Sequence, residues 1–389
     1  MAGQPEIWFL NNSQDSIDWF MRGPTLEKIE QLGWTINRNE SGTRLEPERW
    51  AELIASADAL LTTWGSPKVD AALLARNDSC RIIGHVGGSV APYVDASAFE
   101  RGIRVCTAND LMARSVAESC VMMMLMGLRR AHVHVKLGVR SENMVWGKDW
   151  QIRPAEDCRI GIWGYGDIAR WVVRLLRPFE PGEMLVVSGH LSDEDAAAEG
   201  LRKVSFDELF EQADVIFTLA GMTIENTGRV GAEQLAAIKD GALLINVGRA
   251  PLIQPGPLVE ELRKGRFTGI FDVYEKEPLP EDDPLNALPH VILQPHNAGT
   301  ARDATYMAAM LDEIDRFLRG EPLRYEVSGE RGHMMTDLQA VRQAQQSGRA
   351  TGGGHEKRGT KGSAQGEGEA RPRENWLAVQ KSKRPQDRR

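Results

Sequence analysis

A short glycine-rich turn between a strand-like run and an amphipathic segment constrains the fold of this chain more than any other feature. Gly164 and Gly166 follow the run 159–163, and Ala169 lies near the start of the segment 167–176, whose apolar residues recur at helical spacing. Two glycines allow a tight turn with an open backbone, and a small residue three positions later lets the helix pack closely on the strand. The pattern predicts one βαβ unit of a parallel sheet.

Similar strand-like runs alternate with helical segments through most of the chain. They occur at 6–10, 59–64, 81–86, 184–187, 215–218, 242–246, 269–273 and 291–293. Alternation of this kind is typical of α/β folds with parallel sheets, and 389 residues suffice for two such domains. The segment 116–128 is apolar on all sides but short and contains an acidic residue, so we expect a helix buried between domains rather than a membrane span.

The position of the glycine turn, at the N-terminus of a predicted helix, is typical of a dinucleotide-binding site. Free N–H groups and the positive end of the helix dipole favour a pyrophosphate at such a turn. A glycine turn by itself also occurs as a plain connection, so the prediction depends on the flanking strand and helix. The residues expected to meet the cofactor there are Gly164, Tyr165, Gly166, Asp167 and Ile168.

Three downstream motifs carry side chains suited to the reduction of a 2-keto acid. Arg249 follows the run 242–246, Glu277 precedes a proline, and His296 follows one. A planar guanidinium can bind a carboxylate through two hydrogen bonds, and an imidazole can donate or accept a proton near neutrality. A carboxylate beside the imidazole would fix its tautomer. Singly, these residues are explained as well by a salt bridge, a turn and a loop; their order and joint presence favour an active site.

Together with the glycine turn, these motifs resemble those of the D-isomer-specific 2-hydroxyacid dehydrogenase family. The resemblance implies two Rossmann-like domains with parallel sheets and an active site in the interdomain cleft. It implies a discontinuous substrate domain, 1–107 plus 299–327, and an NAD(P)-binding domain, 108–298. It further implies a cytoplasmic, homodimeric oxidoreductase that transfers a hydride reversibly between nicotinamide C4 and a small 2-keto or 2-hydroxy acid. The catalytic residues that it implies are Arg249, Glu277 and His296.

The resemblance also assigns further contacts. Asp272 would bond the nicotinamide carboxamide, although an aspartate at such a place is also common as a cap or turn residue. The loop Gly87-Gly88-Ser89 follows a predicted strand, and its backbone N–H groups suit a small anion nest for the substrate carboxylate; a plain tight turn is the alternative. The other positions implied beside the cofactor are Ser188, Val247 and Gly248.

The end of the second strand in the nucleotide domain leaves the choice of cofactor open. An NAD site usually carries an acid there, which bonds the ribose 2′-hydroxyl. This chain has Ser188, and the nearest acid is Asp193, beyond the end of the strand. A 2′-phosphate would therefore meet no repulsion, but no arginine follows immediately to bind it. The sequence allows NADP as well as NAD.

Composition limits the partners. The net charge of −8 argues against nucleic acid as the main partner, and the N-terminus lacks the pattern of a signal peptide. The four cysteines show neither paired nor ligand spacing, so we expect buried thiols in a cytosolic protein and no metal site. Residues 328–389 are rich in Gly, Gln, Ser and Arg and net positive by about six, and we expect a disordered tail.

A second function is compatible with the same patterns. Some relatives act as nicotinamide-sensing transcriptional corepressors that share this fold and carry a disordered C-terminal tail. The tail of this chain favours such a binding protein, as do Leu219 and Gly221, which replace a His and a Pro usual in the family. The complete set of catalytic residues favours an enzyme, and the dehydrogenase is the leading hypothesis.

Overall fold

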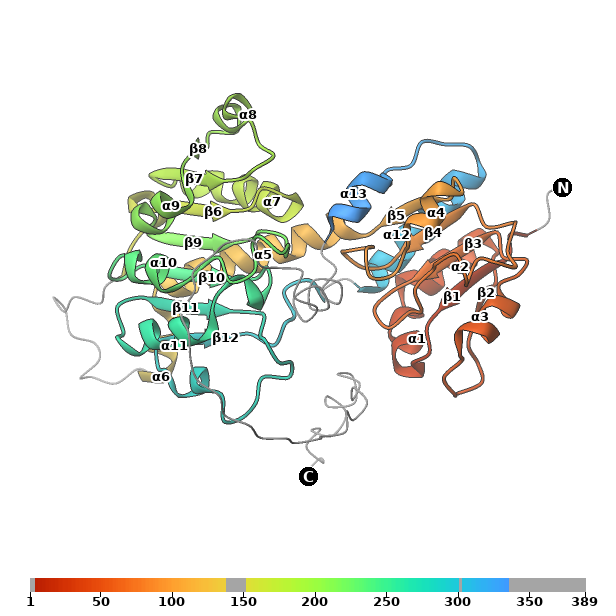
Figure 1. The fold of residues 1–389 in the computed structure, drawn as a ribbon, viewed down its shortest axis with the longest axis horizontal. Helices are drawn as coiled ribbons and strands as arrows, with labels where there is room; N and C mark the ends of the chain where they lie inside the picture. Colours follow the sequence, from red (N-terminus) through yellow and green to blue (C-terminus); the bar gives the residue numbers. More distant parts are fainter. Residues whose placement is uncertain (1–3, 138–151, 301–302, 336–389) are drawn as a thin grey trace, which may run out of the picture.

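The computed structural model describes residues 4–137, 152–300 and 303–335. These residues form two parallel β-sheets with helices packed around each, joined by one long helix (Figure 1). The fold class predicted from the sequence, an α/β chain with two parallel sheets, is confirmed.

The first sheet has five parallel strands in the order β2-β1-β3-β4-β5. Its strands are β1 (Ile7–Leu10), β2 (Ile36–Arg38), β3 (Ala59–Thr62), β4 (Ile82–His85) and β5 (Arg104–Thr107). Its helices are α1 (Gln14–Phe20), α2 (Pro24–Leu32), α3 (Pro47–Leu53), α4 (Ala96–Glu100) and, from much later in the chain, α12 (Asp303–Leu318). Helix α12 packs on α2 and β4 and completes an apolar core with the buried faces of β1 and β3. A late segment of the chain therefore supplies part of the first core.

The second sheet has seven parallel strands in the order β12-β11-β10-β9-β6-β7-β8. Its strands are β6 (Arg159–Trp163), β7 (Glu183–Val187), β8 (Arg202–Lys203), β9 (Val215–Thr218), β10 (Leu243–Asn246), β11 (Thr268–Phe271) and β12 (Val291–Leu293). Its helices are α7 (Asp167–Leu176), α8 (Asp193–Ala198), α9 (Phe206–Gln212), α10 (Ala232–Ala237) and α11 (Pro255–Arg263). The strand order reverses between β6 and β9, and ligands bind at the carboxyl ends of strands beside such a reversal.

Helix α5 (Asn109–Leu128) leaves the end of β5 and packs on α7 and β10 of the second sheet. It is long and apolar enough to cross a membrane, but half of its most apolar stretch is buried inside the protein, as expected of a core helix. A short helix, α6 (Ala131–Leu137), follows. Residues 138–151, which follow α6, lie outside the described residues.

The C-terminal part of the described chain differs from the prediction. Val327 N–H donates to the carbonyl of Val105 at 2.8 Å, which ties the chain to β5, and α13 (Gly329–Met334) follows. The prediction of disorder from residue 328 onward is therefore wrong for 328–335. The serine and glycine content of this segment led to the prediction of disorder. In the structure, Ser328 caps the helix, and the glycines permit close packing on Phe99.

Candidate active site

The glycine turn has the geometry that its sequence predicts. Gly164 has φ of +94°, and a Cβ atom there would lie 2.5 Å from Cα of Ala220 in the loop after β9, so only glycine fits. A Cβ atom on Gly166 would meet nothing within 4 Å, which leaves open space beside the backbone. Gly166 is the N-cap of α7, and no side chain caps this helix. Its first-turn N–H groups are thus suited to an anion.

The other predicted cofactor positions surround this turn or follow neighbouring strands. Tyr165 and Ile168 are partly buried and pack on the core between α5 and α7. Ser188 follows β7, and its hydroxyl accepts the N–H of His190 at 3.3 Å. The carboxylate of Asp193, the nearest acid in the sequence, lies 2.9 Å from Nζ of Lys203.

The turn after β10 shapes the position of Arg249. Asn246 holds the turn from inside: its side-chain oxygen accepts the N–H of Gly248 at 3.1 Å, and its amide donates to the carbonyl of Arg249 at 3.2 Å. Val247 and Gly248 are buried, and a Cβ atom on Gly248 would lie 2.7 Å from the carbonyl oxygen of Thr218. No motif in the sequence marks Asn246, because its role depends on the folded turn.

The Arg249 guanidinium is incompletely bonded. Nη1 donates to the carbonyl of Gly248 at 2.7 Å, whereas Nε is buried and has no partner among the described residues. Burial lowers the pKa of Arg249, and the negative charge of Glu277 opposes that shift. Buried donors are almost always hydrogen-bonded, so a buried, unpaired Nε on a partly buried cation indicates a place for an anionic ligand.

His296 and Glu277 are brought into direct contact. Nδ1 of His296 lies 2.7 Å from Oε2 of Glu277, and the N–H of Tyr274 donates to Oε1 at 3.1 Å. Burial alone would raise the pKa of Glu277, but the hydrogen bond from His296 and its charge outweigh burial, so this pKa is lowered. An ionised carboxylate at Nδ1 fixes the orientation of the ring and leaves Nε2 for a proton transfer.

Asp272 supports the loop that carries His296. Its two carboxylate oxygens accept the backbone N–H groups of Asn297 and Ala298, at 3.0 and 3.1 Å, and the side chain is 2% exposed. His296 itself has φ of +51°, in the left-handed region that non-glycine residues rarely adopt. Burial raises the pKa of Asp272, and the two N–H bonds counteract this only in part. The structure therefore gives Asp272 a positioning role in addition to the cofactor contact expected from the resemblance.

The loop Gly87-Gly88-Ser89 follows β4 in the first sheet. The Thr107 hydroxyl lies 2.8 Å from the carbonyl oxygen of Gly87 and 2.7 Å from that of Gly88. Because a peptide N–H points opposite to the carbonyl of the same unit, the N–H groups of Gly88 and Ser89 point away from Thr107. This orientation fits the predicted anion nest, and Thr107 is a support that the sequence did not reveal.

His85 lies behind the same loop. Its Nδ1 is 2.9 Å from the hydroxyl of Thr62, the ring stacks on Tyr93, and Nε2 has no partner in the described part of the chain. Complete burial lowers the pKa of His85 to about 3, so the ring is neutral at physiological pH. A Cβ atom on Gly87 would lie 2.5 Å from Nε2, which explains why this loop begins with glycine.

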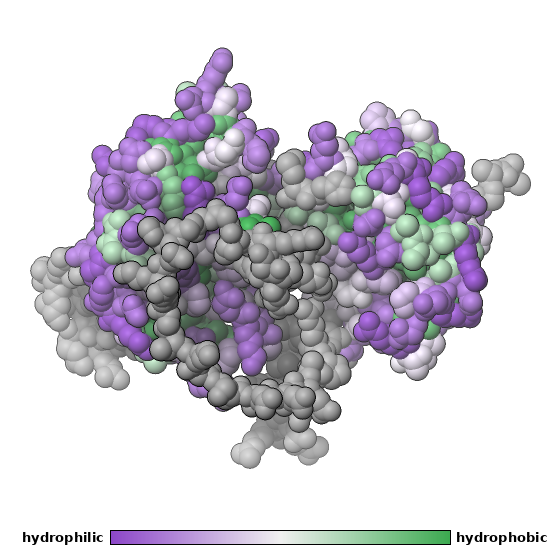
Figure 2. Space-filling view, viewed as in Figure 1, coloured by the Kyte–Doolittle hydropathy of each residue, from purple (hydrophilic) through white to green (hydrophobic). Residues whose placement is uncertain are grey.

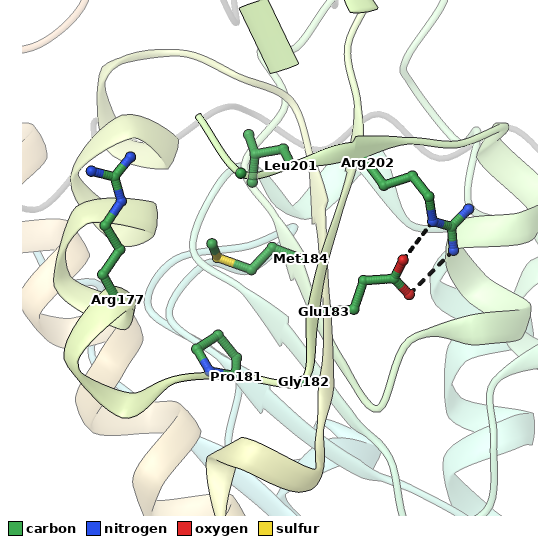
Figure 3. A pocket seen from close by; sticks show the side chains of 8 residues that line it. Arg177, Pro181, Gly182, Glu183, Met184, Leu201 and Arg202 are labelled. Atoms are coloured by element: carbon green, nitrogen blue, oxygen red, sulfur yellow. Dashed lines mark hydrogen bonds and ion pairs between the residues drawn. The ribbon is translucent and has the colours of Figure 1, made fainter. Parts of the chain in front are cut away.

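A surface hollow of about 440 Å³ lies away from these residues. It opens at the start of β7, where Glu183 pairs with Arg202 (Figure 3). This is the amino end of the strand, opposite to the end that carries the glycine turn. In the space-filling view the outline is indented between the two sheets (Figure 2).

Among the described residues, no group of three His, Cys, Asp or Glu could hold a metal ion, and all four cysteines are buried and free.

The chain is similar in sequence to known dehydrogenases and reductases. Residues 121–298 match the NAD-binding domain of D-isomer-specific 2-hydroxyacid dehydrogenases. The chain is 30% identical to D-3-phosphoglycerate dehydrogenase of Archaeoglobus fulgidus over 67% of this chain and 50% of that protein. It is 27% identical to glyoxylate/hydroxypyruvate reductase B of Escherichia fergusonii over 76% of this chain and 91% of that protein. The chain thus spans about half the length of the phosphoglycerate dehydrogenases that it matches.

Solved structures of related enzymes have a similar fold. A crystal structure of a phosphoglycerate oxidoreductase from Rhizobium etli superposes with a TM-score of 0.70 at 23% identity, over 84% of this chain and 99% of that one. A D-lactate dehydrogenase from Treponema pallidum gives a TM-score of 0.63 at 22% identity, over 83% and 99%. These similarities, together with the glycine turn and the motifs around Arg249, Glu277 and His296, show that the chain belongs to the D-isomer-specific 2-hydroxyacid dehydrogenase family.

Proposed function

We propose that this chain is an NAD(P)-dependent D-2-hydroxyacid dehydrogenase, an oxidoreductase that acts on the CH–OH group of a small 2-hydroxy acid. The observation that carries the proposal is the hydrogen bond of 2.7 Å between His296 and Glu277, at the carboxyl edge of the sheet that also carries the partly buried Arg249. Relatives named for phosphoglycerate, glyoxylate and hydroxypyruvate support the same class of substrate.

The residues at the start of α7 fit a nicotinamide dinucleotide. The first turn has no side-chain cap, and the space where a Cβ atom of Gly166 would stand is open. A pyrophosphate would accept the N–H groups of this turn and benefit from the helix dipole. The bound nicotinamide supplies or takes up the hydride. Ser188, without an acid beside it, supports both NAD and NADP, and the assay below decides between them.

Each catalytic residue has a defined task in the proposed reduction. Arg249 binds the substrate carboxylate through its unpaired edge and polarises the carbonyl group. His296 donates the proton at Nε2 to the carbonyl oxygen while hydride reaches the carbonyl carbon, which gives the CH–OH group. Glu277 stays ionised at Nδ1 and stabilises the imidazolium before the transfer. In oxidation the same imidazole takes the hydroxyl proton.

The direct test is oxidation of NADH and NADPH, measured separately by absorbance. The full chain is assayed with glyoxylate, hydroxypyruvate, pyruvate, phenylpyruvate and 2-ketoisocaproate. His296→Gln is compared with His290→Gln, a matched control on the other side of β12, where Nε2 of His290 bonds to the carbonyl of Leu262. We expect turnover with at least one acid and a loss of roughly 10²–10⁴-fold in His296→Gln alone, since general acid–base catalysis has this size.

The outcomes separate the two functions considered. Turnover that depends on His296, with the control unchanged, supports the dehydrogenase, and the better cofactor identifies the preference set around Ser188. Dinucleotide binding without turnover on any of the acids would contradict the proposal and favour the nicotinamide sensor. We also propose a homodimer, which analytical ultracentrifugation of the full chain tests directly.

A further inference from the structure

Asp167 places a negative charge at the proposed pyrophosphate position. It is the first residue of α7, directly after the open glycine turn, and its side chain is 19% exposed. An acid in the first turn ordinarily stabilises a helix through the dipole. When the same turn also receives a pyrophosphate, the carboxylate lies next to charges of its own sign, and the two repel each other. A site with this acid needs a compensating cation.

Two donors from other elements converge on that carboxylate. Nδ2 of Asn109, at the start of α5, lies 2.5 Å from Oδ2 of Asp167, and Nη2 of Arg331, on α13, lies 2.5 Å from the same oxygen. Figure 1 shows α13 at the side of the first sheet that faces α7. The C-terminal helix thus delivers a guanidinium from the first sheet to the nucleotide turn of the second.

The surroundings of α13 hold Arg331 in this place. Ser328 caps the helix and its hydroxyl accepts the Arg331 N–H at 3.2 Å. Gly329 and Gly332 turn toward Phe99, where added Cβ atoms would stand 3.4 and 3.1 Å from the ring, so the helix packs closely on α4. Only Nη2 of the guanidinium is engaged; its Nε and Nη1 groups donate to none of the described residues.

We propose that Arg331 is a residue of the dinucleotide site: Asp167 holds its guanidinium at the start of α7, where the remaining donors bind the cofactor pyrophosphate. A guanidinium suits this task because its rigid fork can bond a carboxylate on one edge and a phosphate on the other. The inference rests on the proposed function, and it makes the nucleotide site composite, with one phosphate ligand supplied by a segment beyond residue 327.

The test is the equilibrium dissociation constant of NADH, NADPH and ADP-ribose, measured by calorimetry on the full chain and on Arg331→Gln. We expect binding of all three to weaken by roughly tenfold or more, since a charge-assisted hydrogen bond to phosphate is lost. Arg319→Gln is the matched control: Arg319 is 55% exposed against 52% for Arg331, and it also pairs with an aspartate. It should bind all three ligands as the unaltered chain does.

A double variant distinguishes contact from simple neutralisation. If Arg331 bonds the pyrophosphate, Asp167→Asn combined with Arg331→Gln stays weak. Recovery of full affinity in the double variant would overturn the proposal, because Arg331 would then only cancel the charge of Asp167. Unchanged affinity in Arg331→Gln, or a loss confined to NADPH, would also overturn it. If the unaltered chain bound none of the three ligands, the proposed function itself would fail, and this inference with it.

Discussion

Replacing Asp272 by asparagine tests whether the loop of the catalytic histidine is held by a single buried carboxylate. Both oxygens of Asp272 accept backbone N–H groups, at 3.0 Å from Asn297 and 3.1 Å from Ala298, and the side chain is 2% exposed. An asparagine offers one acceptor oxygen and one donor amide. One of the two N–H groups would therefore lose its acceptor and face another donor.

The size of the effect follows from these bonds. A buried donor left without a partner costs about 1–3 kcal/mol, and bonds to an ionised acceptor lie toward the upper end of that range. We therefore expect the free energy of unfolding of Asp272→Asn to fall by roughly 2 kcal/mol. Since His296 has φ of +51°, its loop should relax when one anchor is lost. A displacement of about 1 Å in a catalytic group can lower turnover by about 10²-fold.

The assay combines urea unfolding with turnover of the best acid found for the unaltered chain. Asp283→Asn is the control, because Asp283 also accepts a backbone N–H, from Leu285 at 2.9 Å, but at a surface cap where asparagine serves equally well. If Asp272→Asn unfolded at the same urea concentration as the unaltered chain and kept its turnover, the supporting role of the carboxylate would be refuted.

Three further predictions follow from the same geometry. The pKa of Glu277 is lowered because its bond to His296 outweighs the effect of burial. The stability that the ionised Glu277 contributes is therefore present above the ordinary glutamate pKa and is lost as the pH falls through the lowered value. In acid titrations of unfolding, the stability difference between the unaltered chain and Glu277→Gln should shrink below about pH 4. Asp214→Ala removes a carboxylate that bonds one backbone N–H and two cationic side chains, and calorimetry should show a loss of about 3 kcal/mol; a loss under about 0.5 kcal/mol would contradict this reading. Gly164→Ala forces a Cβ atom to 2.5 Å from Cα of Ala220 at φ of +94°, so dinucleotide affinity and melting temperature should both drop, and an unchanged melting temperature would argue against the close approach.

Local sequence was sufficient to predict an element where the residues of that element alone favour its structure. The run 159–163, the glycines at 164 and 166 and the helix from Asp167 form as predicted, because strand propensity, turn flexibility and helical periodicity all act within a few residues. The short edge strands β2 and β8 were missed, since Ile-Asn-Arg and Arg-Lys carry no apolar run; pairing with a neighbouring strand makes them strands.

The sequence by itself determined which chemical groups this protein carries and in which order: a dinucleotide turn, a guanidinium, a carboxylate and an imidazole. Only the tertiary structure decided which groups meet, because contacts such as His296 with Glu277, or Asp167 with Arg331, join residues 19 and 164 positions apart. Nothing in the composition of the C-terminal segment indicates a helix that carries a cation to the nucleotide turn. That helix forms where Phe99, on α4 of the first sheet, and Asp167, on α7 of the second, provide the packing surface and the counter-charge.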